Sequence, residues 1–188
     1  ISYSADYVYI QGTGLATSVM GPWYDNTAKT SVFPSFPGNQ ALLYRFPRVV
    51  NYGPDYVSPK NATTPGNCDL FANSVPLYNT TDTFSYSNAN AGDAGPTESY
   101  QGDGVWNRDA FTNEGVTFDS GNAHQAMESF HYHASPTALR HLLNDSVDYD
   151  STVVFTGLPA NGGDSPYTEN FSPIIGWVND GLPMYGPY

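Results

Sequence analysis

Three of the four histidines of this chain lie between residues 124 and 133. His131 and His133 are separated by one residue, and His124 stands seven residues before His131. In an extended strand, residues i and i+2 point to the same side, with Cβ atoms roughly 7 Å apart. Two imidazoles placed in this way can bind one metal ion, and a short loop back to His124 can supply a third ligand. Imidazole suits copper, zinc, iron or nickel.

The spacing therefore predicts a metal site formed by His124, His131 and His133, with copper or zinc as its occupant. The alternative is that His131 and His133 flank Tyr132 in a half-buried strand and hydrogen-bond to nearby backbone. The fourth histidine, His141, falls near the end of a short helix expected over residues 136–143, where a cation interacts favourably with the helix dipole. We interpret His141 as structural rather than as a fourth ligand.

The sequence carries no catalytic signature. It lacks a glycine-rich phosphate loop, a Cys-x-x-Cys pair, Gly-x-Ser-x-Gly and His-Glu-x-x-His. Glu114 and Asp119 are the carboxylates to inspect for glycoside hydrolysis, but 18 acidic residues supply such pairs freely. We expect a non-enzymatic protein without catalytic residues and without an organic cofactor. The acidic cluster at Asp145, Asp148 and Asp150 is interpreted as a solvated turn rather than a weak calcium site.

Two runs of residues resemble the YHYH-domain family of secreted proteins. The first holds Asp109-Ala110, Glu114, Phe118-Asp119, Gly121, Ala123-His124, Phe130-His131-Tyr132-His133 and Pro136. The second holds Ser172-Pro173-Ile174-Ile175-Gly176-Trp177 followed by Asp180-Gly181-Leu182-Pro183-Met184-Tyr185-Gly186-Pro187. A weaker match is Asn73-Ser74-Val75-Pro76-Leu77-Tyr78 with Asp82. The resemblance covers about residues 66–188 and implies a secreted β domain, without an activity to carry over.

The chain departs from the family pattern close to the histidines. Gly121 stands where the family usually has cysteine, Ala123 where it has glycine, and Phe130 where it has the first tyrosine. Phe171 stands where a histidine commonly precedes Ser-Pro. The resemblance therefore implies a degenerate form of the family motif around the histidines.

The charge excludes several classes of partner. Six Lys and Arg against 18 Asp and Glu give a formal charge of −12, which argues against nucleic acid or an anionic membrane surface as partner. No run of about 18 apolar residues exists, so no membrane span is expected.

Other features favour an extracellular protein. The chain begins at Ile1, as a processed chain does, and its single cysteine, Cys68, has no partner for an internal disulfide. We expect the Cys68 thiol to be buried rather than paired with a cysteine of another chain. Four sequons predict N-linked glycans, at Asn61, Asn79, Asn144 and Asn170.

The fold is predicted to be mainly β: a β-sandwich-like single domain with long loops and one short helix. Aromatic and β-branched runs punctuated by glycine and proline favour many short strands. Strands are expected within residues 1–19, 41–50, 68–78, 151–156 and 174–178, with a surface loop over 79–104. Residues 1–19 are expected to be an N-terminal strand or arm, exchanged between subunits or closing its own sheet, and residues 20–188 the β domain.

Low charge, abundant tyrosine, sequons and an apolar N-terminal strand favour a structural function. We expect a self-associating subunit of an extracellular fibre or coat, a homopolymer joined through the N-terminal strand. One alternative is a transition-metal binding module that uses the histidine cluster. Another is a carbohydrate-binding module that uses exposed aromatic residues at Trp23, Trp106 and Trp177.

Overall fold

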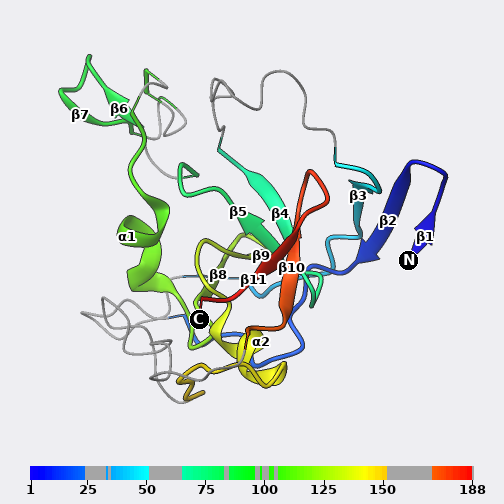
Figure 1. Ribbon diagram of the computed structural model, residues 1–188. Coiled ribbons are helices and arrows are strands. Elements are labelled where there is room, and N and C mark those ends of the chain that lie inside the picture. Colours follow the sequence, from blue (N-terminus) through cyan, green and yellow to red (C-terminus); the bar gives the residue numbers. More distant parts are fainter. Residues whose placement is uncertain are drawn as a thin grey trace.

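The computed structural model describes residues 1–23, 33, 35–50, 65–82, 85–95, 98, 102–103, 106–151 and 171–187. In this part of the chain the fold is mainly β and includes a short helix, which confirms the predicted fold class (Figure 1). Its strands are β1 Ser2–Tyr3, β2 Tyr7–Gly12, β3 Leu42–Pro47, β4 Asn67–Phe71, β5 Pro76–Tyr78, β6 Tyr86–Ser87, β7 Gly92–Asp93, β8 Ala123–Ala126, β9 Ser129–Tyr132, β10 Ile174–Val178 and β11 Pro183–Tyr185. The helices are α1 Ala110–Glu114, a 3₁₀ turn Gly115–Thr117 and α2 Thr137–Leu142.

The largest sheet has six strands in the order β11-β10-β4-β5-β9-β8. Neighbouring strands are antiparallel except β5 and β9, which run parallel and pair at Leu77 and Tyr132. The β8–β9 hairpin, which carries the histidines, therefore forms one edge of this sheet.

A second sheet holds β1, β2 and β3. The single strand predicted within residues 1–19 is wrong in detail, because the segment folds back on itself as a hairpin. Ser4 and Tyr7 close the turn, since Ser4 N–H donates to Tyr7 O and Tyr7 N–H donates to Ser4 Oγ. All of β2 then pairs with β3, from Tyr7 opposite Pro47 to Gly12 opposite Leu42. Exchange of this arm between subunits stays a prediction.

The two sheets approach each other at two glycines. A Cβ added to Gly12 at the end of β2 would lie 2.4 Å from Ser74 Cβ in the β4–β5 turn. Gly181, in the β10–β11 turn, has φ +93° and would place a Cβ 2.5 Å from Pro47 O at the end of β3. Between these contacts lies an apolar cavity of about 510 Å³, lined from both sheets by Val8, Ile10, Phe46, Leu70, Phe71 and Trp177.

The core packs against one face of the histidine hairpin. Phe130 and Tyr132 point into it, together with Ala123 on β8. Side chains alternate along a strand, so His131 on β9 and its neighbour His124 on β8 point to the opposite face. The remaining members of this cluster are Trp23, Phe71, Val75, Leu139 and Ile175.

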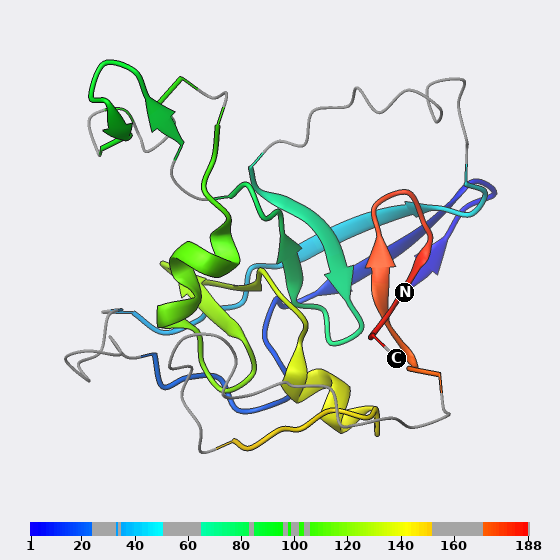
Figure 2. The same ribbon diagram turned by 60° about the vertical axis from the view of Figure 1, so that its left-hand side comes forward.

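Several predicted elements have different bounds. The strand expected over 68–78 is two strands, β4 and β5, because residues 72–74 turn and Ser74 has φ +65°. Within the surface loop expected over 79–104, β6 and β7 form a small hairpin, which lies at the opposite end of the molecule from β1 and β2 (Figures 1 and 2). The strand β10 and the helix α2 lie where they were predicted. The strand expected over 151–156 falls almost entirely outside the described residues.

No helix in the described part of the chain is both long enough and apolar enough to cross a membrane. This finding agrees with the prediction of no membrane span.

Candidate metal centre

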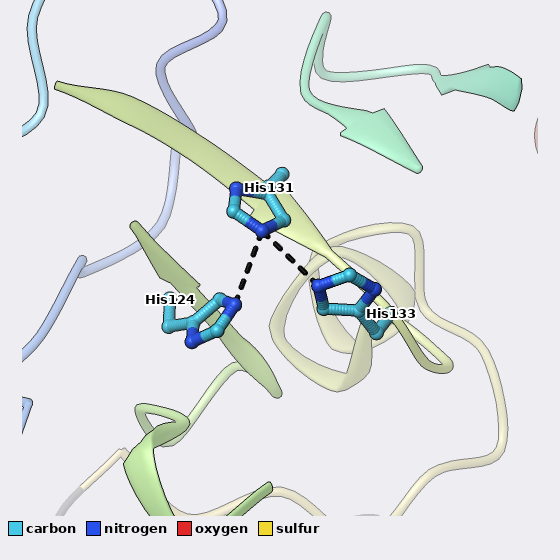
Figure 3. Close-up of side chains that lie close together, drawn as sticks. All are labelled: His124, His131 and His133. Atoms are coloured by element: carbon cyan, nitrogen blue, oxygen red, sulfur yellow. Dashed lines mark hydrogen bonds between the residues drawn. The ribbon is translucent and has the colours of Figure 1, made fainter. Parts of the chain in front are cut away.

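Three imidazole rings converge on one point beside the β8–β9 hairpin (Figure 3). The Nε2 atom of His131 lies 3.1 Å from Nε2 of His124 and 3.1 Å from Nε2 of His133. All three residues are buried. The structure thus brings together every residue predicted to hold a metal.

The hairpin register places the rings. His124 and His131 are direct cross-strand partners, so their side chains leave the same face of the sheet. His133 follows the last residue of β9 and lies two residues from His131, which returns its side chain to that face. The predicted arrangement of two histidines on one side and a third across a short turn is therefore confirmed.

The backbone fixes the tautomer of His131. Its Nδ1 lies 2.9 Å from the carbonyl oxygen of Ser129. A carbonyl oxygen only accepts, so Nδ1 carries the proton and donates it. In the neutral ring, Nε2 is then an unprotonated lone pair directed at the other two imidazoles.

A threonine fixes the tautomer of His124 in the same way. The Thr117 hydroxyl donates to the Glu114 carbonyl oxygen at 2.7 Å, which uses its only proton. The same oxygen lies 2.9 Å from His124 Nδ1, so it accepts the Nδ1 proton. The Nε2 atom of His124 is therefore also a bare acceptor. A ligating histidine usually donates its other N–H in this manner.

His133 has no such restraint. Its Nδ1 is buried and has no hydrogen-bond partner in the part of the chain that the structure describes. Its proton can sit on either nitrogen. The unprotonated Nε2 atoms of His124 and His131 thus face the imidazole of His133, which can carry its proton on either nitrogen.

A carboxylate that the sequence reasoning missed completes the cluster. Glu114 Oε2 lies 3.1 Å from His133 Nε2 and 3.4 Å from His124 Nε2. Glu114 is the last residue of α1, a helix that Asp109 caps by accepting from Thr112 N–H at 2.8 Å. The signal in the sequence was its place in the motif region upstream of the histidines, where it was considered only as a hydrolytic acid.

The protonation states of the histidines and of Glu114 at neutral pH favour metal binding. Burial lowers the pKa of His131 to about 3, and burial also lowers the pKa of His124. Burial alone would raise the pKa of Glu114, but its interactions with the neighbouring imidazoles of His124 and His133 outweigh burial and hold that pKa at about 2. Neutral imidazole and ionised carboxylate are the forms that bind metal.

Aromatic rings enclose the cluster. Tyr78 stacks on His131 with ring centroids 4.2 Å apart, and Phe118 lies against both His124 and His133. Phe33 meets the edge of His124 at 5.9 Å. Such an apolar shell restricts water and holds the rings in place.

Other predicted residues lie elsewhere. His141 is exposed on α2 and packs near Tyr149, which fits a structural interpretation. The solvated-turn interpretation is wrong for Asp145, because its Oδ2 lies 2.6 Å from Nε of buried Arg140. Asp119 is buried and accepts backbone N–H bonds from Gly21, Gly121 and Ala123, so it is committed to the fold.

The predicted sugar and thiol sites are described in part. Asn144 is exposed, whereas Asn79 is half-buried and its side-chain oxygen accepts from Thr81 N–H. Asn61 and Asn170 lie outside the described residues. Glycosylation stays a prediction. Cys68 is half-buried and its thiol donates to Leu77 O, and burial raises its pKa to about 12, so it is a poor nucleophile.

The tryptophans proposed for sugar binding differ in exposure. Trp23 is in the core, Trp177 is half-buried, and Trp106 is 75 % exposed. The carbohydrate-binding alternative rests on Trp106 alone among these three.

A comparison with protein-family models confirms the family resemblance that the sequence motifs indicate. The family model described as YHYH protein matches residues 50–188. No curated protein and no solved structure matches the chain.

Proposed function

Because this chain belongs to the YHYH protein family, whose histidine motif here converges in space, we propose that it is a transition-metal binding module. The ligands are His124, His131 and His133, and the ion is zinc or copper. The proposal selects one of the alternatives left open by the sequence.

One observation carries this proposal: the Nε2 atoms of His124 and His131 are bare acceptors, yet they lie 3.1 Å apart inside the protein. Two lone pairs at this distance repel one another unless a proton or a cation lies between them. The low pKa of His131 disfavours the proton. A metal cation relieves the repulsion and uses the orientation that Ser129 and Thr117 impose.

The test compares two histidines of the same chain. The wild-type protein, loaded with zinc or copper and dialysed, is expected to retain about one equivalent of metal by elemental analysis. His131→Ala removes the central ligand and should reduce this to the background. His141→Ala is the matched control, because it removes an exposed imidazole outside the cluster and should leave the metal content unchanged.

Two results would contradict the metal site. One is a wild-type protein that retains less than about a tenth of an equivalent after loading. The other is a His131→Ala variant that is folded by circular dichroism and holds as much metal as the wild type.

A second candidate function is self-association through the N-terminal segment. Ile1 lies at the rim of the apolar cavity between the two sheets, yet it is 93 % exposed, and Tyr3 on β1 is 78 % exposed. Residues 1–3 of the same chain therefore leave the cavity open. We propose that residues 1–3 of a second copy fill it, which would link copies head to tail. Secretion and a role in a fibre or coat remain predictions that accompany this proposal.

Deleting residues 1–6 tests the second candidate, because it removes β1 while keeping the β2–β3 pairing. Electron microscopy and light scattering should show fibres or oligomers for the wild type and monomers for the shortened chain. Ile1→Ser with Tyr3→Ser should have the same effect without shortening the chain. Assembly that persists in both variants, or a wild type that stays monomeric, would exclude this mode of association.

A further inference from the structure

We propose that Glu114 is the fourth ligand of the metal, so that the site is a set of three imidazole nitrogens and one carboxylate oxygen. This inference rests on the proposed metal-binding function. It adds a ligand from a different element of the fold, since Glu114 ends α1 while the histidines belong to the β8–β9 hairpin.

The distances fit a single ion. Four ligand atoms at about 2.0–2.1 Å from a tetrahedral zinc are separated from one another by about 3.3–3.4 Å. Glu114 Oε2 lies 3.1 Å from His133 Nε2 and 3.4 Å from His124 Nε2, and the two His131 separations are 3.1 Å. Four of the six separations among these ligand atoms are therefore close to those expected around one ion.

The charges also fit a divalent cation. Three neutral imidazoles contribute no charge, and Glu114 contributes one negative charge. A buried cation needs such compensation, and the Glu114 carboxylate offsets half the charge of one divalent ion.

The fold holds Glu114 in this position. The Thr117 hydroxyl donates to the Glu114 carbonyl oxygen and accepts from His124 Nδ1, so it ties the end of α1 to one of the imidazoles. The aromatic ring of Phe118, which follows directly, packs on His124 and His133. Glu114 and the histidines thus behave as one pre-arranged ligand set.

The donor set discriminates between metals. Zinc accepts imidazole and carboxylate ligands in a tetrahedral arrangement, whereas Cu(II) prefers a planar or tetragonal one and Cu(I) prefers softer ligands. The hard carboxylate oxygen of Glu114 therefore disfavours Cu(I), whereas zinc and Cu(II) both suit three imidazoles and one carboxylate.

The test measures zinc affinity by competition with a chromophoric chelator at neutral pH. Glu114→Gln keeps the side-chain shape but removes the charge and the strong oxygen donor. We expect its affinity for zinc to fall by at least about 10-fold, the lower end of the loss seen even for residues that only support a ligand. Glu128→Gln is the matched control, because Glu128 is exposed at the turn of the same hairpin. Its affinity should equal that of the wild type.

Cobalt substitution gives a second readout. The visible spectrum of Co²⁺ in the wild type should show the strong bands of a four-coordinate site, and these should change in Glu114→Gln but not in Glu128→Gln. If Glu114→Gln does not fold, Glu114→Asp provides the same test, because it keeps the charge but withdraws the oxygen by one methylene. Its affinity is also expected to fall at least about 10-fold.

The outcomes separate the two proposals. If a folded Glu114 variant binds zinc as tightly as the wild type while His131→Ala loses it, the three-histidine site stands and Glu114 is not a ligand. If His131→Ala also binds zinc as tightly as the wild type, both proposals fail.

Discussion

At the scale of single residues, the Thr117 hydroxyl fixes the tautomer of the His124 imidazole. It has one proton, which goes to the Glu114 carbonyl oxygen, and it therefore presents a lone pair to His124 Nδ1. This small restraint decides which nitrogen of the imidazole faces the cluster. The same hydroxyl also joins the segment that carries Glu114 to the strand that carries His124.

Thr117→Val removes this acceptor while keeping the shape of the side chain. We expect metal affinity to fall by about 10- to 100-fold, because His124 loses the partner that fixes its tautomer and ring orientation. Competition with a chelator measures the change. Thr112→Val is the control, since Thr112 is exposed on α1 and its side chain should not affect the site. Equal affinities for the two variants would show that Thr117 has no part in orienting the ligand.

The histidines could be predicted from the sequence because their geometry is local. One residue separates His131 from His133, and a two-strand turn returns the chain to His124, so periodicity alone places all three together. Glu114 could not be found in this way. It reaches the cluster through a helix, a 3₁₀ turn and a loop, and no simple period relates its position to the histidines.

At the scale of elements, the packing of the two sheets depends on Gly12, which has no side chain. Gly12 ends β2 directly against Ser74 in the β4–β5 turn. Any Cβ at this position requires the strand or the turn to move.

Gly12→Ala is therefore expected to destabilise the protein by about 1–3 kcal/mol, the usual cost of overpacking a close contact. Chemical unfolding of the metal-free protein measures this free energy. Gly92→Ala in β7 serves as the control, because the nearest atom to an added Cβ is 3.8 Å away. It should change stability by less than about 0.5 kcal/mol. A Gly12 variant as stable as the control would mean that the sheets move apart at no cost.

Hairpins are the elements that sequence patterns predicted least well. The segments 1–19 and 68–78 were each expected to be one strand, because both are rich in apolar residues and lack a strong turn dipeptide. The turns instead depend on Ser4, whose hydroxyl accepts from Tyr7 N–H, and on Ser74, which adopts positive φ. Serine signals a turn only weakly, whereas Asp180-Gly181 in the β10–β11 turn is a dipeptide that strongly favours tight turns.

At the scale of the whole molecule, the predicted class was confirmed but the strand order could not be foreseen. The six-stranded sheet brings β5 beside β9 although about fifty residues separate them, and places β10 against β4 across an even longer interval. Such pairings depend on which buried faces fit together, and one sequence contains no direct record of that. The β5–β9 contact is nonetheless the one that sets Tyr78 on the ring of His131.

The separation of Glu114 from His133 along the chain has a consequence for the unfolded state. A cation held by both residues closes a loop of about twenty residues, and a covalent cross-link over a loop of similar size limits the unfolded ensemble by roughly 3 kcal/mol. A chain with a single cysteine cannot form an internal disulfide. The metal would therefore provide this chain with a cross-link that its single cysteine cannot make. This cross-link would form when the ion is available and break when the ion is removed.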